Sequence, residues 1–270
     1  MHPRQRQHAI PHLLSTVLLP VVAIGFTLAA HAEDGPEPST SLTFNVGVVS
    51  DYRVRGIAQT STKPAIQAGV DFAMKSGPYL GIAASNVTWV KEFNGASKGS
   101  YELDFYGGYK AQITDTSFSY DVGVITYRYP GNDSGAPGTV GAGAFSNANT
   151  TEIYGALTHG MYTFKYSRSL GDFLGNLNSS GSQYFDLSAA IDLTNGFTLT
   201  PHIGRQLIPN QSPFSGSYTD VALTLTKDFT NGFVVTAALM GTNADKTFYT
   251  DTRGRYLADT TLSVGLKYSF

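Results

Sequence analysis

The chain has 270 residues, of which 14% are charged and 12% aromatic, and its formal net charge is −2. It contains no cysteine, which excludes disulfide bonds and thiolate metal sites. The mildly acidic balance and the absence of a basic patch argue against nucleic acid as a partner.

The first 32 residues have the layout of a secretory signal peptide. A basic start at Arg4 and Arg6 precedes the apolar stretch Leu13–Ala30 and a small-residue cleavage motif. A proline inside the apolar stretch disfavours the alternative, a membrane anchor helix. We therefore expect export and cleavage between Ala32 and Glu33.

After this segment the sequence predicts a flexible leader over residues 33–40 and a single β-barrel domain over residues 41–270. Twelve segments alternate between apolar and polar residues with the period of two that is typical of β-strands. The expected strands cover residues 41–54, 64–74, 78–90, 100–113, 117–129, 150–158, 161–169, 183–194, 197–207, 217–229, 233–242 and 256–270. No run after the signal segment approaches the roughly 20 apolar residues that a membrane-spanning helix needs.

The first predicted strand shows the alternation clearly. Its apolar face, which we expect to contact lipid, carries Leu42, Phe44, Val46, Val48, Tyr52 and Val54. Asp51, Arg53 and Arg55 share the opposite face and are expected to point into the lumen near the external end. On the lipid face, each arginine would cost about 2–4 kcal/mol at mid-membrane.

The predicted connections alternate strictly between short and long. The five short turns are Lys75-Ser76-Gly77, Thr114-Asp115-Thr116, His159-Gly160, Asn195-Gly196 and Asn231-Gly232. The last two dipeptides favour type I′ turns. Outer-membrane barrels combine short periplasmic turns with long extracellular loops. The sequence therefore predicts an all-β fold, a transmembrane antiparallel β-barrel of about 12 strands surrounded by outer-membrane lipids.

The same alternation places charged side chains on the inward face along the whole chain. The candidates for lining a pore are Asp51, Arg53, Arg55, Asp71, Glu102, Asp104, Lys110, Asp121, Glu152, Lys165, Asp186, Asp192, Asp220 and Asp259. Acidic residues predominate, which would favour cations. The alternative interpretation is that these charges pair with one another and fill the barrel.

Several segments resemble a known family. They are SDYRVRGIAQT at residues 50–60, KPAIQAGVDF at 63–72, YLGIAASNV at 79–87, YELDFYGGY at 101–109 and YDVGVITYRYPG at 120–131. These segments resemble the outer-membrane porins described as TorF-like, also known as the Gcw_chp family. The chain departs from that pattern at Val54, Ala58 and Ala83, where the family has an aromatic residue, a serine and a tryptophan. The resemblance implies a porin.

The last predicted strand ends in an alternating apolar face formed by Leu266, Tyr268 and Phe270. A terminal phenylalanine preceded by such a face resembles the last-strand signal of bacterial outer-membrane barrels. We therefore expect these residues to act as an assembly signal for the barrel-assembly machinery.

Three functions are compatible with these patterns. The first is passive diffusion of small solutes or ions through a narrow polar lumen, because about 12 strands lie between the filled barrels of about 8 and the open porins of about 16. The second is a binding or structural barrel that acts through its external loops, of which residues 130–149 form the longest. The third, a lipid hydrolase, is disfavoured because only His159 and His202 remain after cleavage and no G-x-S-x-G motif occurs. No cofactor or metal is expected.

Overall fold

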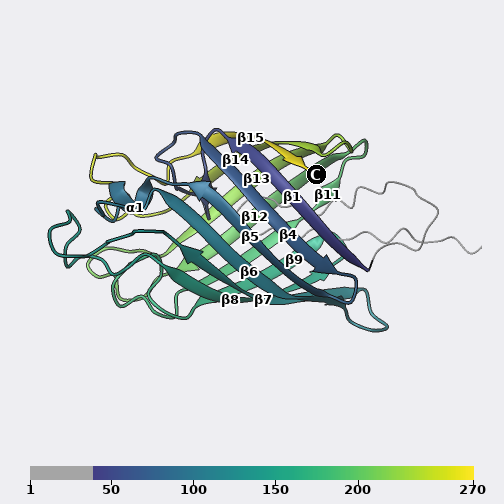
Figure 1. Ribbon diagram of the computed structural model, residues 1–270, viewed down its shortest axis with the longest axis horizontal. Coiled ribbons are helices and arrows are strands. Elements are labelled where there is room, and N and C mark those ends of the chain that lie inside the picture. Colours follow the sequence, from purple (N-terminus) through teal and green to yellow (C-terminus); the bar gives the residue numbers. More distant parts are fainter. Residues whose placement is uncertain (1–38) are drawn as a thin grey trace, which may run out of the picture.

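The computed structural model describes residues 39–270, which form one antiparallel β-barrel with long connections at one end (Figure 1). Its elements are β1 (Thr40–Val49), β2 (Arg53–Val54), β3 (Ile57–Ala58), β4 (Ala65–Met74), β5 (Pro78–Asn86), α1 (Trp89–Glu92), β6 (Tyr101–Gln112), β7 (Phe118–Arg128), β8 (Thr150–His159), β9 (Tyr162–Ser169), β10 (Gln183–Ala189), β11 (Ile191–Asp192), β12 (Phe197–Leu207), β13 (Tyr218–Asp228), β14 (Phe233–Thr242) and β15 (Thr261–Ser269). The predicted signal peptide, residues 1–32, and the leader residues 33–38 lie outside the described residues.

Twelve strands make up the wall in this part of the chain. The strands β10 and β11 both pair with β12 and form one wall strand interrupted at Ala190, whereas β2 and β3 pair only with each other. Each other strand pairs with its neighbours in chain order, and β15 returns to β1, with Val46 opposite Tyr268. This pairing closes the sheet and confirms the predicted barrel of 12 strands. Closure leaves no sheet edge, so every backbone group in the wall can be paired within lipid.

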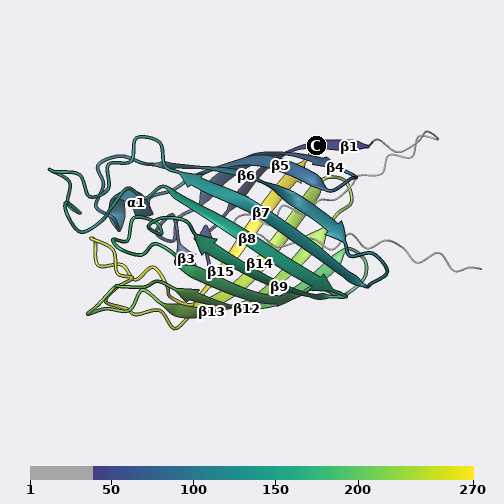
Figure 2. The same ribbon diagram turned by 90° about the horizontal axis from the view of Figure 1, so that it is seen from below.

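The two ends of the barrel differ as expected. Short turns gather at the end where the described chain begins, and α1 lies with the long connections at the opposite end (Figure 2). At the short turn 194–197, Asn195 and Gly196 both have positive φ, as a type I′ turn requires. The type I′ prediction is wrong for the turn at 231–232, because there Thr230 and Gly232, not Asn231, have positive φ.

The outer face of the wall is apolar. The alternation of exposure along β1 leaves Leu42, Phe44, Val46 and Val48 exposed, and β15 exposes Leu262, Val264, Leu266 and Tyr268 in the same way. Within residues 39–270, none of the helical structure has the length and apolarity that a membrane-crossing helix requires.

Phe270 lies at the seam between the last strand and the first. Its backbone exchanges two hydrogen bonds of 2.9 Å with Phe44, and their rings stack with centroids 5.9 Å apart. The ring of Tyr268 lies 5.7 Å from that of Phe270 on the same outer face. The role of this face as an assembly signal stays a prediction.

The inner wall from β5 to β12 is built from tyrosines that lie over glycines of the adjacent strand. Tyr106 covers Gly81, Tyr79 covers Gly108, Tyr154 covers Gly123 and Tyr184 covers Gly204, each at a separation that leaves no room for a Cβ atom. The tyrosine hydroxyls reach inward-facing carboxylates, as Tyr79 does when it donates to Asp121 at 2.6 Å. The glycines thus let large aromatic rings lie flat against the wall.

We expect Gly204→Ala to destabilise the barrel. An added Cβ would lie 2.5 Å from Cζ of Tyr184 and 2.7 Å from Oδ1 of Asp220, so the ring must move. Overpacking of this kind costs about 1–3 kcal/mol. The control is Gly155→Ala, where the nearest atom is 3.9 Å away. Urea unfolding of both variants in detergent measures the effect, and equal midpoints would contradict the tyrosine-on-glycine packing.

The predicted course of the first strand is wrong beyond Val49. The chain leaves the wall at Ser50 and folds into the lumen, where β2 and β3 form a hairpin, before β4 rejoins the wall at Ala65. The predicted third strand also ends early, at Asn86, because residues 88–92 turn into α1, and the last strand begins at Thr261 instead of residue 256.

Candidate functional site

The segment that enters the lumen, residues 50–60, is here called the inner hairpin. Its turn falls at Arg55 and Gly56, which have φ of 50° and 80°. Gly56 is required there, because its positive φ is strained for other residues and a Cβ would meet Thr242 and Asp220. The inner hairpin therefore fits closely against the wall near the external end of the barrel.

Arg53 fixes the base of the inner hairpin. Its guanidinium donates to the carboxylates of Asp51 at 2.8 Å and Asp259 at 2.7 Å. It also donates to the carbonyl oxygens of Gly56 at 3.0 Å and Asp259 at 2.7 Å. Since the side chain of Arg53 is fully buried, this set of acceptors replaces the water that its charge has lost.

Arg55 anchors the tip of the inner hairpin to the opposite wall. Two of its nitrogens donate to Glu152 on β8, at 3.1 and 2.8 Å, and one donates to Gln206 on β12 at 2.7 Å. Its guanidinium lies 4.2 Å from the ring centroid of Tyr184 and 5.4 Å from that of Phe173. Both charged partners are buried, so loss of either one would leave an uncompensated charge.

The structure places Tyr52 and Val54 on a different surface from the one that the sequence predicts. Tyr52 was expected on the lipid face, but it is buried in the lumen and donates to Glu102 at 2.6 Å. Val54 packs against the same buried cluster. Arg53 and Arg55 do lie inside the lumen, as predicted, but on the inner hairpin and not on a wall strand.

The short helix α1 closes over the inner hairpin. The backbone nitrogens of Thr88 and Trp89 donate to the carbonyl of Gln59, at 2.8 and 3.2 Å, so the hairpin satisfies the first donors of the helix. Glu92 accepts hydrogen bonds from Ser61 and Thr88 and an ion pair from Arg253 at 2.7 Å. Burial raises the pKa of Glu92, but these hydrogen bonds and the Arg253 charge outweigh it and lower the pKa overall.

Two external loops contact α1. Phe145, from residues 130–149, lies with its ring 5.7 Å from that of Phe93, and the backbone nitrogen of Thr252 donates to the carbonyl of Glu92 at 2.8 Å. Val140 of the same loop is instead 83% exposed. The external mouth is thus covered by the inner hairpin, α1 and loops from distant parts of the sequence.

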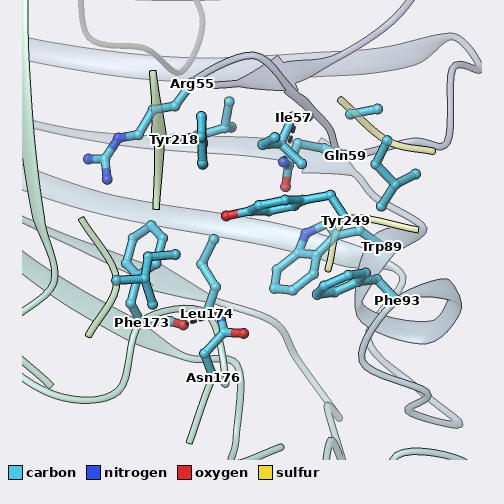
Figure 3. Close-up of a pocket in the computed structure, with 14 residues that line it drawn as sticks. Arg55, Ile57, Gln59, Trp89, Phe93, Phe173, Leu174, Asn176, Tyr218 and Tyr249 are labelled. Atoms are coloured by element: carbon cyan, nitrogen blue, oxygen red, sulfur yellow. Dashed lines mark hydrogen bonds between the residues drawn. The ribbon is translucent and has the colours of Figure 1, made fainter. Parts of the chain in front are cut away.

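A cavity of about 50 Å³ remains inside this covering (Figure 3). Five aromatic side chains line it, namely Trp89, Phe93, Phe173, Tyr218 and Tyr249. Arg55, Gln59 and Asn176 supply its polar groups. The cavity therefore joins the inner hairpin to residues of the external loops.

The strand-borne candidates lie on the inward face, as the alternation predicts. Those that are buried are Asp71, Glu102, Asp104, Asp121, Glu152, Lys165, Asp186 and Asp220; Lys110 is half-buried and Asp192 is exposed. Asp259 is also exposed, but it precedes β15 and is not on a strand. Most of them have partners. Tyr106 and Asn45 donate to Asp71, Tyr129 donates to Glu102 at 2.7 Å, and the ammonium group of Lys165 lies 4.2 Å from the ring centroid of Tyr154. Asp192 instead accepts from the backbone of Thr194 at the short-turn end.

His202 joins two of these carboxylates. Its Nδ1 lies 2.8 Å from Asp186, and its Nε2 lies 2.8 Å from Asp220. Because carboxylates occupy both ring nitrogens, neither nitrogen is available to activate a nucleophilic serine. His159, the other candidate base, stacks on Phe118 at the short-turn end, with ring centroids 4.5 Å apart.

Across the lumen from the tyrosine-rich wall of β5 to β12, small residues line the inner face of β13 and β14. The inward positions of β13 and β14 include Ala222, Thr224, Thr236 and Ala238, and all four are partly exposed. Across the two strands, Thr224 lies opposite Ala238, Ala222 lies opposite Met240, and Thr236 lies opposite Thr226. Solvent therefore reaches this wall inside the barrel, in contrast to the packed tyrosines and carboxylates opposite.

The sequence did not single out several residues of the covered mouth. Gln59, Trp89 and Glu92 were assigned to a loop or to the end of a strand, and a helix of four residues is too short for a detectable period. The signal that was available is the dipeptide Arg55-Gly56, since glycine after a polar run favours a turn.

Comparison with known proteins agrees with this architecture. The family model Gcw_chp, described as a bacterial protein of unknown function, matches residues 33–270. The chain belongs to the Gcw_chp family. The narrower TorF-like grouping stays a prediction. A comparison with curated proteins found no significant match.

Solved structures similar to this Gcw_chp chain include outer-membrane porins. The KdgM porin, in complex with disordered oligogalacturonate, is 8% identical, with a TM-score of 0.51 over 86% of this chain and 99% of that chain. The NanC porin is 12% identical, with a TM-score of 0.49 over 85% and 99%. The outer membrane protein OprD from Pseudomonas aeruginosa is 13% identical, with a TM-score of 0.40 over 85% and 65%. The likeness to KdgM is one of fold.

Proposed function

We propose that this Gcw_chp chain is an outer-membrane channel through which small solutes or ions diffuse passively, and that the inner hairpin forms its external constriction. The observation that carries the proposal is the partly exposed wall of Ala222, Thr224, Thr236 and Ala238. A barrel that served only as a rigid support would have no need to leave one inner wall solvated. The likeness of fold to the KdgM porin supports the same conclusion.

The charge of the lumen favours cations. Within residues 39–270, the buried carboxylates in the lumen are Asp51, Asp71, Glu102, Asp104, Asp121, Glu152, Asp186 and Asp220, against Arg53, Arg55 and Lys165 as buried cations. An acidic lining lowers the energy of a cation in a narrow pore and raises that of an anion. The strand-borne carboxylates thus serve as proposed pore-lining groups.

Planar-bilayer recording of the purified protein tests this function. With a KCl gradient, we expect small, ohmic conductance steps and a reversal potential displaced toward that of potassium. The preference should weaken at high salt, because the Debye length falls from about 10 Å at 0.1 M to about 3 Å at 1 M. A bilayer that stays silent at high protein density, or a chloride preference, would refute the channel as proposed.

The alternative of a binding or structural barrel remains the second candidate, and its support is the covered external mouth. The hydrolase alternative has less support, because His202 has no free ring nitrogen and His159 lies at the short-turn end. Silent bilayers combined with a folded protein would favour the binding barrel.

A further inference from the structure

The cavity at the covered mouth contains a buried donor without a partner. Trp89 is only 4% exposed, and its Nε1 has no hydrogen-bond partner among residues 39–270. Buried polar groups are nearly always paired, so an unpaired indole N–H calls for an explanation. Trp89 lines the cavity beside Tyr249 and Gln59 (Figure 3).

An acceptor lies in the same cavity. The Nε2 atom of Gln59 donates to the carbonyl of Ile57 at 2.8 Å, which leaves the side-chain oxygen without a donor from the hairpin. Figure 3 shows the Gln59 side chain directed toward the rings of Trp89 and Tyr249. The cavity therefore offers a neutral donor from Trp89 and a neutral acceptor from Gln59.

Among residues 39–270, Arg55 is the one charged side chain in the cavity lining, and Glu152 compensates its charge. The guanidinium of Arg55 is paired with Glu152 at 3.1 and 2.8 Å, and the hydroxyl of Tyr249 donates to the carbonyl of Gly216. Asn176 donates its amide nitrogen to the carbonyl of Phe173 at 2.9 Å, and the rest of the lining is aromatic or aliphatic, with Phe93 and Phe173 among its members. A charged ligand would lose its hydration without finding an uncompensated opposite charge here, at a cost far above that of a neutral polar group.

We propose that this cavity binds a small, uncharged, hydroxyl-bearing solute of the polyol class. One hydroxyl group of the solute accepts from Trp89 Nε1, another donates to the side-chain oxygen of Gln59, and the carbon chain packs against the aromatic rings. With about 10–15 Å³ per water, a cavity of about 50 Å³ takes a molecule the size of glycerol or one end of a longer polyol. The binding site thus indicates which class of solute the channel carries. Binding itself does not depend on the proposed function, and only the role of the site in transport rests on it.

Trp89 also provides the test, because it is the only tryptophan in the chain. The folded full chain in detergent is titrated with glycerol, and the emission of Trp89 is recorded. We expect a saturable change in emission. Gln59→Leu keeps the size of the side chain but removes the acceptor, so the saturable change should disappear. Gln112→Leu, at an exposed site by the short turns, should leave it unaltered.

Acetate is the charged probe of similar size. The site is supported if the emission saturates with glycerol but not with acetate, and if the glycerol saturation is lost in Gln59→Leu but kept in Gln112→Leu. A linear change, or a saturable change that is the same in Gln59→Leu, overturns it, and saturation by acetate alone overturns the solute class. Because the titration needs no membrane, failure of the site is distinguishable from failure of the channel, which the bilayer recordings decide.

Discussion

Shortening the inner hairpin is expected to raise the conductance of the barrel several-fold. Val49 and Ala65 are directly opposite each other on β1 and β4, so a turn of a few glycine and serine residues can join them in place of residues 50–64. The wall strands and their register stay unaltered. The change removes Arg53, Arg55 and Tyr52 from the external half of the lumen, where they are buried.

The measurement is single-channel conductance in planar bilayers, with correct folding checked by heat-modifiable migration on gels. The matched control replaces residues 130–149 by a glycine and serine turn as short as the one in the first variant. That loop covers the mouth from outside and does not enter the wall. The conductance of this control should change much less. Equal conductance of the shortened and unaltered proteins would show that the inner hairpin is not the constriction.

The ion pair between Arg55 and Glu152 is expected to dominate the stability of the covered mouth. Removing one member of a buried pair costs about 3–5 kcal/mol, because the other charge is left without a partner. Arg55→Met keeps the length of the stem, and Glu152→Gln keeps the shape of the carboxylate. Each single variant should therefore lower the free energy of unfolding by about that amount, whereas the double variant should recover most of the loss.

Urea unfolding of the folded barrel in detergent measures these differences. Arg205→Met is the matched control, because Arg205 lies on the same strand as Gln206 but is exposed, and such changes are usually within about 0.5 kcal/mol. If the losses in the two single variants simply add in the double variant, the two side chains do not act as a pair.

The barrel could be predicted from the sequence because alternation and turn chemistry are local signals. The face of Leu42, Phe44, Val46 and Val48 follows from the period of two alone, and so does the odd-numbered inner face of β15. The alternation of short and long connections then predicted which end of the barrel carries the short turns and which carries the long loops. Neither inference depends on knowing what lies across the lumen.

The inner hairpin could not be predicted in the same way. Alternation breaks at Val49 and Ser50 but resumes from Asp51 through Arg55, although the chain has already left the wall, because a hairpin inside the lumen also has two faces. What decides its position is the pairing of Arg55 with Glu152, 97 residues away, and of Arg53 with Asp259, 206 residues away. Contacts of such separation leave no local trace in one sequence.

The cavity was missed for a related reason. Trp89 was expected at the end of a strand, where its indole would face lipid or lumen. In the structure the carbonyl of Gln59 accepts from the backbone of Thr88 and Trp89, and this starts α1 instead. The aromatic lining is then assembled from residues as far apart as Trp89, Phe173 and Tyr249.

Thiol labelling from outside the cell tests most directly whether a solvated passage ends at the inner hairpin. The chain has no cysteine, so Thr224→Cys places a single thiol on the inward wall of β13, and Leu223→Cys places one on the outer face as a control. The reagent is trimethylammonium-ethyl methanethiosulfonate, a membrane-impermeant cation. We predict slow labelling of Thr224→Cys in intact cells, fast labelling once the inner hairpin is shortened, and fast labelling in both proteins when the reagent is admitted to the periplasm. Equal rates from outside with and without the hairpin, or no reaction from the periplasmic side, would contradict the account.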